Sequence, residues 1–84
     1  RSFYEESLST LERLDPLSGV TFDVAYVNAQ VAQHARALDV VDAVLLPGAN
    51  HPQLRVVLVR DVRPALVREL AEARALQAEL RRAP

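Results

Sequence analysis

The chain has 84 residues, of which 50% are hydrophobic and 25% are charged, and its formal net charge is −1. This length permits one small domain or a part of one. The near-neutral charge excludes a strongly basic nucleic-acid-binding protein and a strongly acidic disordered tail. The absence of cysteine excludes disulfides, thiolate metal sites and cysteine nucleophiles, and a content of two glycines argues against a glycine-rich phosphate loop. No apolar run is long enough to span a bilayer.

The first segment predicts a short helix over residues 2–15. Ser2 and Glu5 have the spacing of a capping box, in which each side chain bonds a free backbone amide at the helix start. Apolar residues follow at helical spacing. Asp15-Pro16 ends the pattern, because the residue before a proline disfavours helical geometry.

The second predicted helix covers residues 21–46, with Thr21 as its N-cap and Pro47-Gly48 as its end. Its apolar positions are spaced alternately by four and three residues, which is the a/d seam of coiled coils and helical bundles. The seam comprises Val20, Val24, Val27, Val31, His34, Leu38, Val41 and Leu45.

The third predicted helix covers residues 52–82 and begins at Pro52, a favourable residue for a first turn. The run Val56–Val59 is also compatible with a strand, but the length and the continuing helical period favour helix. We expect Pro64 to kink this helix, because proline removes one backbone hydrogen bond. The apolar stripe comprises Leu54, Leu58, Val62, Ala65, Leu66, Leu70, Ala73, Leu76 and Leu80.

The two long helices are each about 40–45 Å long at 1.5 Å per residue, and the short loop between them makes them antiparallel neighbours. A compact chain of this size has a radius of gyration of about 12 Å, so these helices are too long for a closed globule. We therefore predict an all-α fold: a long antiparallel hairpin plus a short N-terminal helix. This is half of an up-down four-helix bundle, completed by a second copy or by further chain.

Two motifs carry a family resemblance. The segment LSGVTFDVAYVNAQVAQH, residues 17–34, resembles a bacterial four-helix family of unknown function that is similar to ferritin-like bundles. Its members are often labelled predicted outer membrane or periplasmic proteins. The family pattern has Asp before the histidine, where this chain has Gln33. The residues that match are Phe22, Asp23, Tyr26 and His34.

The family's last helix carries a Leu-Pro-x-Leu-x-x-His-Leu motif. Pro64, Leu66 and Leu70 match it, and Glu69 replaces the histidine. The resemblance covers the C-terminal half of the family domain, so we interpret the chain as a fragment. It implies a bacterial protein exported to the periplasm or cell envelope, and it implies no settled activity.

His34 and Glu69 are the candidate site residues, because each is an ionisable group on an otherwise apolar face. A carboxylate on such a face is costly unless it is paired or bound to a cation. In a hairpin turning near residue 49, His34 lies about one helical turn from Glu69. We expect a His–Glu hydrogen bond that fixes helix register. The alternative is a divalent metal site in the complete domain, since imidazole and carboxylate from facing helices are ligands in ferritin-like bundles.

Other candidates have simpler interpretations. We expect Asp23 to lie in the first turn of the second helix, with Tyr26 at the end of the bundle, and His51 to be a solvated loop residue. The serines lack the spacing of a nucleophile elbow. We expect the arginines of the third helix to form a solvated face with the interleaved carboxylates, without nucleic-acid binding. These arginines are Arg55, Arg60, Arg63, Arg68, Arg74, Arg81 and Arg82.

The function that these observations favour is a non-enzymatic helical-bundle module with no resident cofactor. Its unmatched a/d seam predicts self-association, most simply as a dimer, or packing against a helix of another protein.

Overall fold

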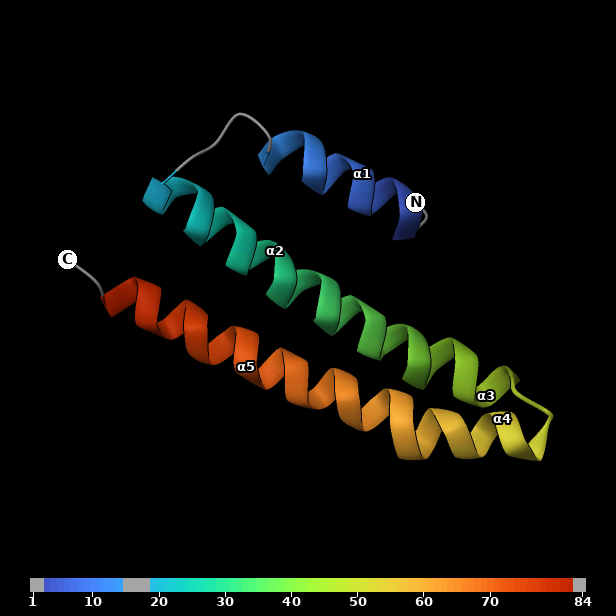
Figure 1. Cartoon of the computed structure of the whole chain (residues 1–84). Coiled ribbons are helices and arrows are strands. Elements are labelled where there is room, and N and C mark those ends of the chain that lie inside the picture. The colour runs from blue at the N-terminus through green and yellow to red at the C-terminus, as the bar shows by residue number, and fades with distance from the viewer. Residues whose placement is uncertain (1–2, 15–18, 83–84) are drawn as a thin grey trace.

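The computed structural model describes residues 3–14 and 19–82, and it contains helices and no strand in those ranges. Two continuous helical rods, residues 19–48 and residues 52–82, run antiparallel and form a long hairpin, which a short helix precedes (Figure 1). The predicted all-α hairpin with a short N-terminal helix is confirmed. The elements are α1 (Phe3–Leu14), α2 (Gly19–Val40), the π-helical turn η1 (Val41–Leu45), α3 (Leu46–Gly48), α4 (Pro52–Val57), the π-helical turn η2 (Leu58–Val62) and α5 (Arg63–Arg82).

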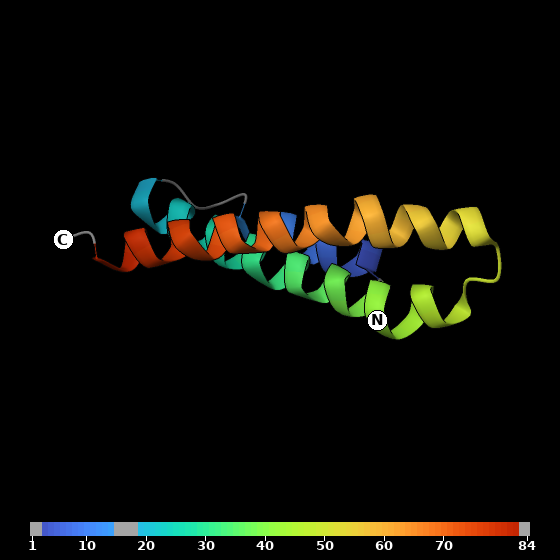
Figure 2. The same cartoon turned by 90° about the horizontal axis from the view of Figure 1, so that it is seen from below.

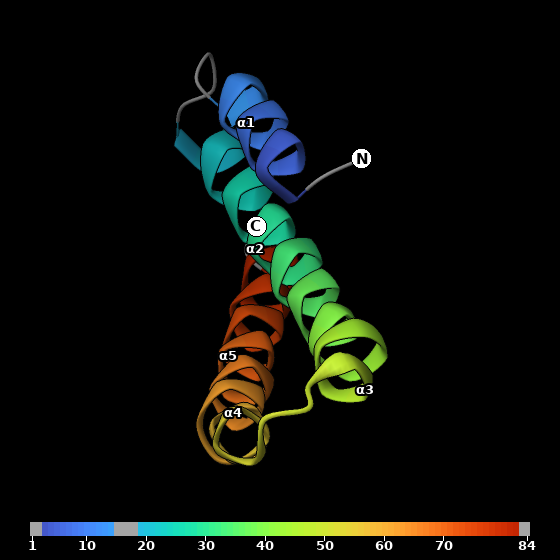
Figure 3. The same ribbon diagram turned by 90° about the vertical axis from the view of Figure 1, so that its right-hand side faces the viewer.

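The three helical units form an open row, in which α1 and α5 lie on opposite sides of α2 (Figures 1 and 3). Seen from below, the two rods of the hairpin cross rather than run strictly parallel (Figure 2). The molecule measures 49 × 26 × 15 Å, with a radius of gyration of 15.3 Å. A compact chain of this length has a radius of about 12 Å, so the expectation of an elongated, open structure is met.

The apolar core is small. Within the described residues, five side chains are buried: Leu14, Val27, Val41, Leu58 and Leu70. Val27 and Val41 come from the predicted seam, and Leu58 and Leu70 come from the apolar stripe of the third helix. Other members of the same pattern remain open to solvent, with Val20 74% exposed and Leu76 48% exposed. The hairpin therefore buries a few separate positions of each apolar face and leaves much of the rest uncovered.

Each π-helical turn is separated from a following proline by one residue. The turn η1 ends at Leu45 and is followed by Leu46 and Pro47, and η2 ends two residues before Pro64 in the same way. In each case the residue before the proline donates its N–H to the carbonyl five residues back, from Leu46 to Val41 and from Arg63 to Leu58.

A proline ring clashes with the carbonyl four residues back in a regular helix, and a wider turn relieves that clash. The structure thus has a π-helical turn at Leu58–Val62, upstream of Pro64, and the expected kink at this proline stays a prediction.

Helix ends differ in detail from the predicted ones. The helix α2 begins at Gly19, whose φ of +63° is a left-handed conformation that glycine adopts without strain. Thr21 is consequently inside the helix and is not its N-cap, and Asp23 lies in the second turn. Helical structure also continues through Gly48 rather than ending at 46. The predicted cap at Ser2 lies outside the described residues.

The closed end of the hairpin is fixed by two side chains. The ring Nδ1 of His51 accepts a hydrogen bond from the backbone N–H of Gln53 at 3.2 Å, which caps the start of α4. The guanidinium of Arg55 donates to the carbonyls of Leu46 at 2.6 Å and of Ala49 at 3.3 Å. A cation at free C-terminal carbonyls also complements the helix dipole, so Arg55 closes the end of α3.

Candidate functional site

The two predicted site residues are in direct contact. His34 lies in the C-terminal half of α2, and its Nε2 is 3.0 Å from Oε2 of Glu69 on α5. The other ring nitrogen, Nδ1, is 2.7 Å from the backbone carbonyl of Gln30, one turn earlier in the same helix. The imidazole is 21% exposed and the carboxylate 48% exposed. The sequence placed these residues one turn apart, counting from a turn near residue 49. The pairs His34–Glu69, Asp42–Arg63 and Asn28–Gln77 are instead centred near residue 52, and this register brings His34 and Glu69 together.

The two contacts hold the imidazole at both of its nitrogens. Because the backbone carbonyl of Gln30 accepts only, Nδ1 carries the N–H that bonds it, and Nε2 meets the carboxyl group of Glu69. The arrangement is a side-chain bridge between α2 and α5, consistent with the predicted bond that fixes register.

A hollow of about 270 Å³ opens beside this bridge. Its walls come from α2 and α5. A second hollow of about 240 Å³ adjoins it toward the open end of the hairpin and shares three of its residues, Tyr26, Val27 and Leu76. Phe22 stacks on Tyr26 with ring centroids 5.8 Å apart and planes 17° apart, which holds the phenol ring at this edge of α2.

Three carboxylates line the combined hollow, from Asp23, Glu69 and Glu72, and no arginine lines it. Among the described residues, neither Asp23 nor Glu72 forms an ion pair. The apolar part of the lining comes from Tyr26, Val27, Ala73, Leu76 and Leu80. This surface, apolar at its base and negatively charged at its edge, is hereafter called the acidic groove.

His34 and Glu69 are two side chains of the kinds that bind metal ions in proteins. The described residues contain no cluster of three or more His, Cys, Asp or Glu side chains arranged to hold a metal. His34 and Glu69 supply one nitrogen and one carboxylate, whereas structural and catalytic zinc sites take at least three protein ligands. The metal assignment of these two residues stays a prediction.

A second polar bridge crosses the hairpin near its closed end. Arg63 donates Nε to Oδ1 of Asp42 at 2.8 Å and an Nη to Oδ2 at 3.1 Å, a bidentate ion pair between η1 and the start of α5. The hydrogen bond from Arg63 holds the pKa of Asp42 below its usual value, and the same bond raises the pKa of Arg63. Near the open end, Gln77 bonds Asn28 at 2.8 Å.

The third helix was predicted to pair its arginines with carboxylates of the same helix, and this prediction is wrong. Within the described residues, the arginine ion pairs given by the structure join different helices, Arg63 to Asp42 and Arg36 to Glu6 at 3.2 Å. The carboxylates of α5 are not bridged to arginines of their own helix.

Two structural roles have no counterpart in the sequence interpretation. His51 is an exposed loop residue, as expected, and in addition it caps the start of α4. The signal for it was present, because it directly precedes Pro52 at a helix start. The Arg55 contacts had no sequence signal, since their acceptors are backbone carbonyls six and nine residues away.

Comparison with known proteins places this architecture in a family. A family model described as "Domain of unknown function (DUF4142)" matches residues 2–76. The chain belongs to this family. The match spans His34, Glu69 and all of the named groove residues except Leu80, so the bridge and most of the acidic groove lie within the matched region. The prediction of an unknown-function domain family is confirmed at this level. No curated protein and no solved structure matches the chain.

None of the helices in the described ranges is long and apolar enough to cross a membrane. This agrees with the sequence prediction of no membrane-spanning segment.

Proposed function

We propose that this DUF4142 chain is a non-enzymatic helical-bundle module that self-associates through the apolar surface of its hairpin. The observation that supports this most directly is the amount of apolar surface that the open row leaves uncovered. Side chains of both rods and of α1 contribute to it. The large apolar residues that are at least 42% exposed include Leu8, Leu11, Val20, Tyr26, Val44, Leu54, Val56, Val59, Val67 and Leu76.

Apolar surface of this extent favours association. Burial contributes roughly 25 cal/mol per Å², and soluble monomers rarely leave large contiguous apolar patches open to water. Two antiparallel hairpins supply the four long helices of an up-down bundle, so a second copy completes the architecture without further chain. The same surface also suits an amphipathic helix of another protein, which is the alternative outcome.

Sedimentation velocity over a range from 1 to 100 µM tests this proposal. We expect a dimer that dissociates on dilution, with helix content by circular dichroism falling as the monomer forms. A stable and fully helical monomer over the whole range contradicts the proposal.

The proposed site of action is the bacterial cell envelope. The support is the resemblance of the Phe22–His34 and Pro64–Leu70 motifs to a family often labelled as outer membrane or periplasmic proteins. To test this, a reporter that is active only after export is fused to the native gene product. An active reporter is expected, and an inactive one contradicts an envelope location.

A metal-binding module is the second candidate, and one specific observation favours it. The Nδ1 of His34 is held by a backbone carbonyl, as is the second ring nitrogen of many metal-bound histidines. This leaves Nε2 beside Oε2 of Glu69, so that these two atoms are available as neighbouring ligands. Metal analysis of the purified chain and calorimetric titration with Zn²⁺ test it, with His34→Ala as the control. Absence of co-purified metal, together with a gain in stability for Glu69→Leu, contradicts metal binding and favours a purely structural bridge.

A further inference from the structure

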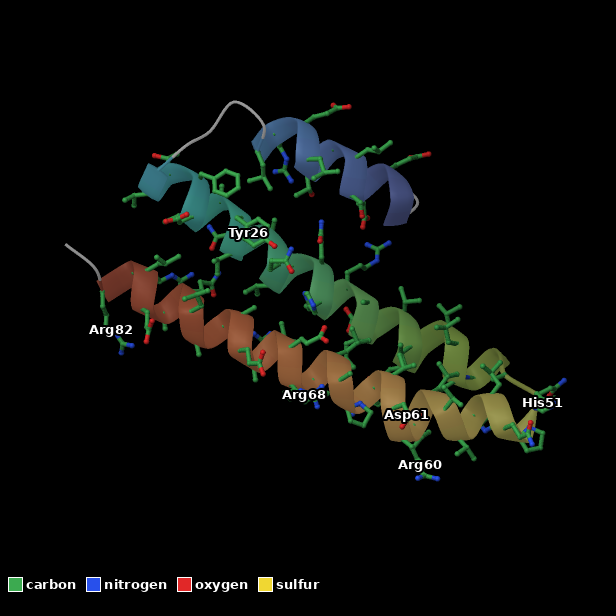
Figure 4. All side chains as sticks on the ribbon, viewed as in Figure 1. Tyr26, His51, Arg60, Asp61, Arg68 and Arg82 are labelled. Atoms are coloured by element: carbon green, nitrogen blue, oxygen red, sulfur yellow. The ribbon has the colours of Figure 1, made fainter. Side chains whose placement is uncertain are left out.

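The acidic groove has a complementary surface on the same chain. Val56 and Val59 lie one turn apart on α4 and η2 and are 47% and 52% exposed. Together with Arg55 and Arg60 they border a shallow hollow of about 240 Å³. This surface, hereafter called the basic strip, has apolar centres and positive edges. Within the described residues Arg60 forms no ion pair, and Figure 4 shows it pointing away from α2.

We propose that the acidic groove of one copy receives the basic strip of a second copy, so that a two-fold dimer contains this contact twice. The inference rests on the self-association proposed above and names the two surfaces that carry it. Arg60 pairs with Glu72, and the two valines pack against Tyr26 and Leu76. In a two-fold interface, each copy presents both surfaces to the other, so the two contacts form together.

The positions of the two surfaces along the rod fit an antiparallel pair. At 1.5 Å per residue, Arg60 lies about 12 Å from the start of the 52–82 rod, and Glu72 lies about 15 Å from its end. Val59 lies about 10 Å from the start and Leu76 about 9 Å from the end. Two rods that overlap fully and run antiparallel therefore bring the strip of one to the level of the groove of the other. Tyr26 and Arg60 mark these two levels in Figure 4.

The charges favour the basic strip over the helix α1 of a second copy as the occupant of the acidic groove. The groove carries the carboxylates of Asp23, Glu69 and Glu72, with His34 as its basic group. The helix α1 of a second copy also offers apolar side chains, Leu8 and Leu11, but it carries three glutamates and one arginine. Like charges facing each other across a contact are destabilising, whereas the basic strip brings two arginines and no carboxylate lining its hollow.

Charge reversal on either surface tests the inference in the full chain. We expect Glu72→Arg and Arg60→Glu each to weaken self-association at least tenfold in Kd by sedimentation velocity. We expect an equimolar mixture of the two variants to associate about as tightly as the unmodified chain. In the mixed dimer both contacts again join an arginine to a glutamate, whereas each variant alone has like charges at both contacts. The double variant is expected to self-associate for the same reason.

Matched reversals elsewhere on the hairpin control for net charge. Asp39→Arg and Arg74→Glu change the charge by the same amounts at exposed positions outside the groove and the strip, and neither is expected to affect the Kd by more than about twofold. Circular dichroism at 222 nm checks that each variant remains helical.

Single variants that self-associate as tightly as the unmodified chain overturn this inference and leave the proposed self-association standing. The same holds for a mixture in which association is not restored. A monomeric unmodified chain instead overturns the proposed self-association itself.

Discussion

The helix α2 packs against a neighbour on each of its two sides, and the two packings differ in kind. Toward α5, the helix α2 and its continuation η1 present large aliphatic side chains, of which Val27 and Val41 are buried, and three polar bridges cross that contact. Toward α1 it presents alanines. Two hollows of about 320 and 310 Å³ remain on that side, and both are lined by Ala29, Ala32, Thr10 and Arg13.

The comparison shows that helical periodicity alone does not make a tight contact. Alanine has high helix propensity but little side chain to interdigitate, so an alanine face packs closely only if the neighbouring helix approaches it closely. The helix α1 turns polar and charged residues toward the alanines, and Leu8 and Leu11 are 42% and 63% exposed. Leu14 is its one buried side chain among residues 5–14. We therefore expect the α2–α5 contact to dominate stability and the α1–α2 contact to open first.

The largest expected effect comes from the α5 side. Leu70 is 7% exposed, and Leu70→Ala should lower the free energy of unfolding by about 2–4 kcal/mol, because it removes buried methyl groups and leaves a cavity. Urea unfolding followed by circular dichroism measures this. The matched change on α1 is Leu11→Ala, which should cost less than about 0.5 kcal/mol. Equal losses for the two variants contradict the ranking of the two contacts.

Filling the alanine side should strengthen the weaker contact. Ala29 lines both hollows, and Ala29→Leu should stabilise the fold by about 1 kcal/mol, since each newly buried methylene contributes about 0.8 kcal/mol at full burial. Hydrogen exchange should also slow in α1. The exposed Ala71→Leu is the control and should leave exchange in α1 unchanged. Faster exchange in α1 of Ala29→Leu indicates overpacking and contradicts this prediction.

The bridge between His34 and Glu69 should contribute less than a core leucine. We expect His34→Ala to cost about 1 kcal/mol, since a hydrogen bond contributes about 0.5–1.5 kcal/mol net. We expect Glu69→Gln to cost a few tenths of a kcal/mol, since its amide donates to Nε2 while Nδ1–H still bonds Gln30. Thermal unfolding of both variants at pH 7 measures this. A larger loss for Glu69→Gln than for His34→Ala shows that the carboxylate has a role beyond this bond.

The smallest effect should come from the exposed ion pair of Asp42 with Arg63, and it should depend on pH. Arg63 lowers the pKa of Asp42 in the folded chain, so the pair stabilises above the ordinary carboxyl pKa of about 3.9 and that contribution is lost as pH falls through the lowered value. Asp42→Asn should therefore lower the thermal midpoint slightly at pH 7, and the difference from the unmodified chain should shrink toward pH 3. Asp61→Asn is the control, and a pH-independent difference for Asp42→Asn contradicts the linkage.

Much of this architecture follows from sequence pattern. The spacing of apolar residues indicated two long helices, and the rod from Pro52 to Arg82 has the bounds that the pattern predicted. The breaker residues Pro47-Gly48 and Pro52 marked the closed end of the hairpin. The adjacency of His34 and Glu69 followed from counting residues on each side of that turn, because an antiparallel hairpin pairs positions that are equally far from it.

Other features depend on relations that spacing does not contain. The register of the hairpin, centred near residue 52, brought His34 and Glu69 to 3.0 Å and placed Asp42 opposite Arg63. The prolines signalled a disturbance, but whether a helix kinks or widens into a π-helical turn depends on packing against the opposite rod. Leu8 and Leu11 share the helical period of the other apolar residues, yet the orientation of α1 leaves them exposed.

The sequence by itself determined the helical class, the hairpin and the polar pair on its apolar face, because these follow from local periodicity and from the position of the turn. Only the tertiary structure decided which parts of each apolar face are buried, where the acidic groove opens and which face α1 turns toward α2. These features depend on how rods cross and rotate about their axes, and a rotation of one helix changes every contact while leaving its sequence period unchanged.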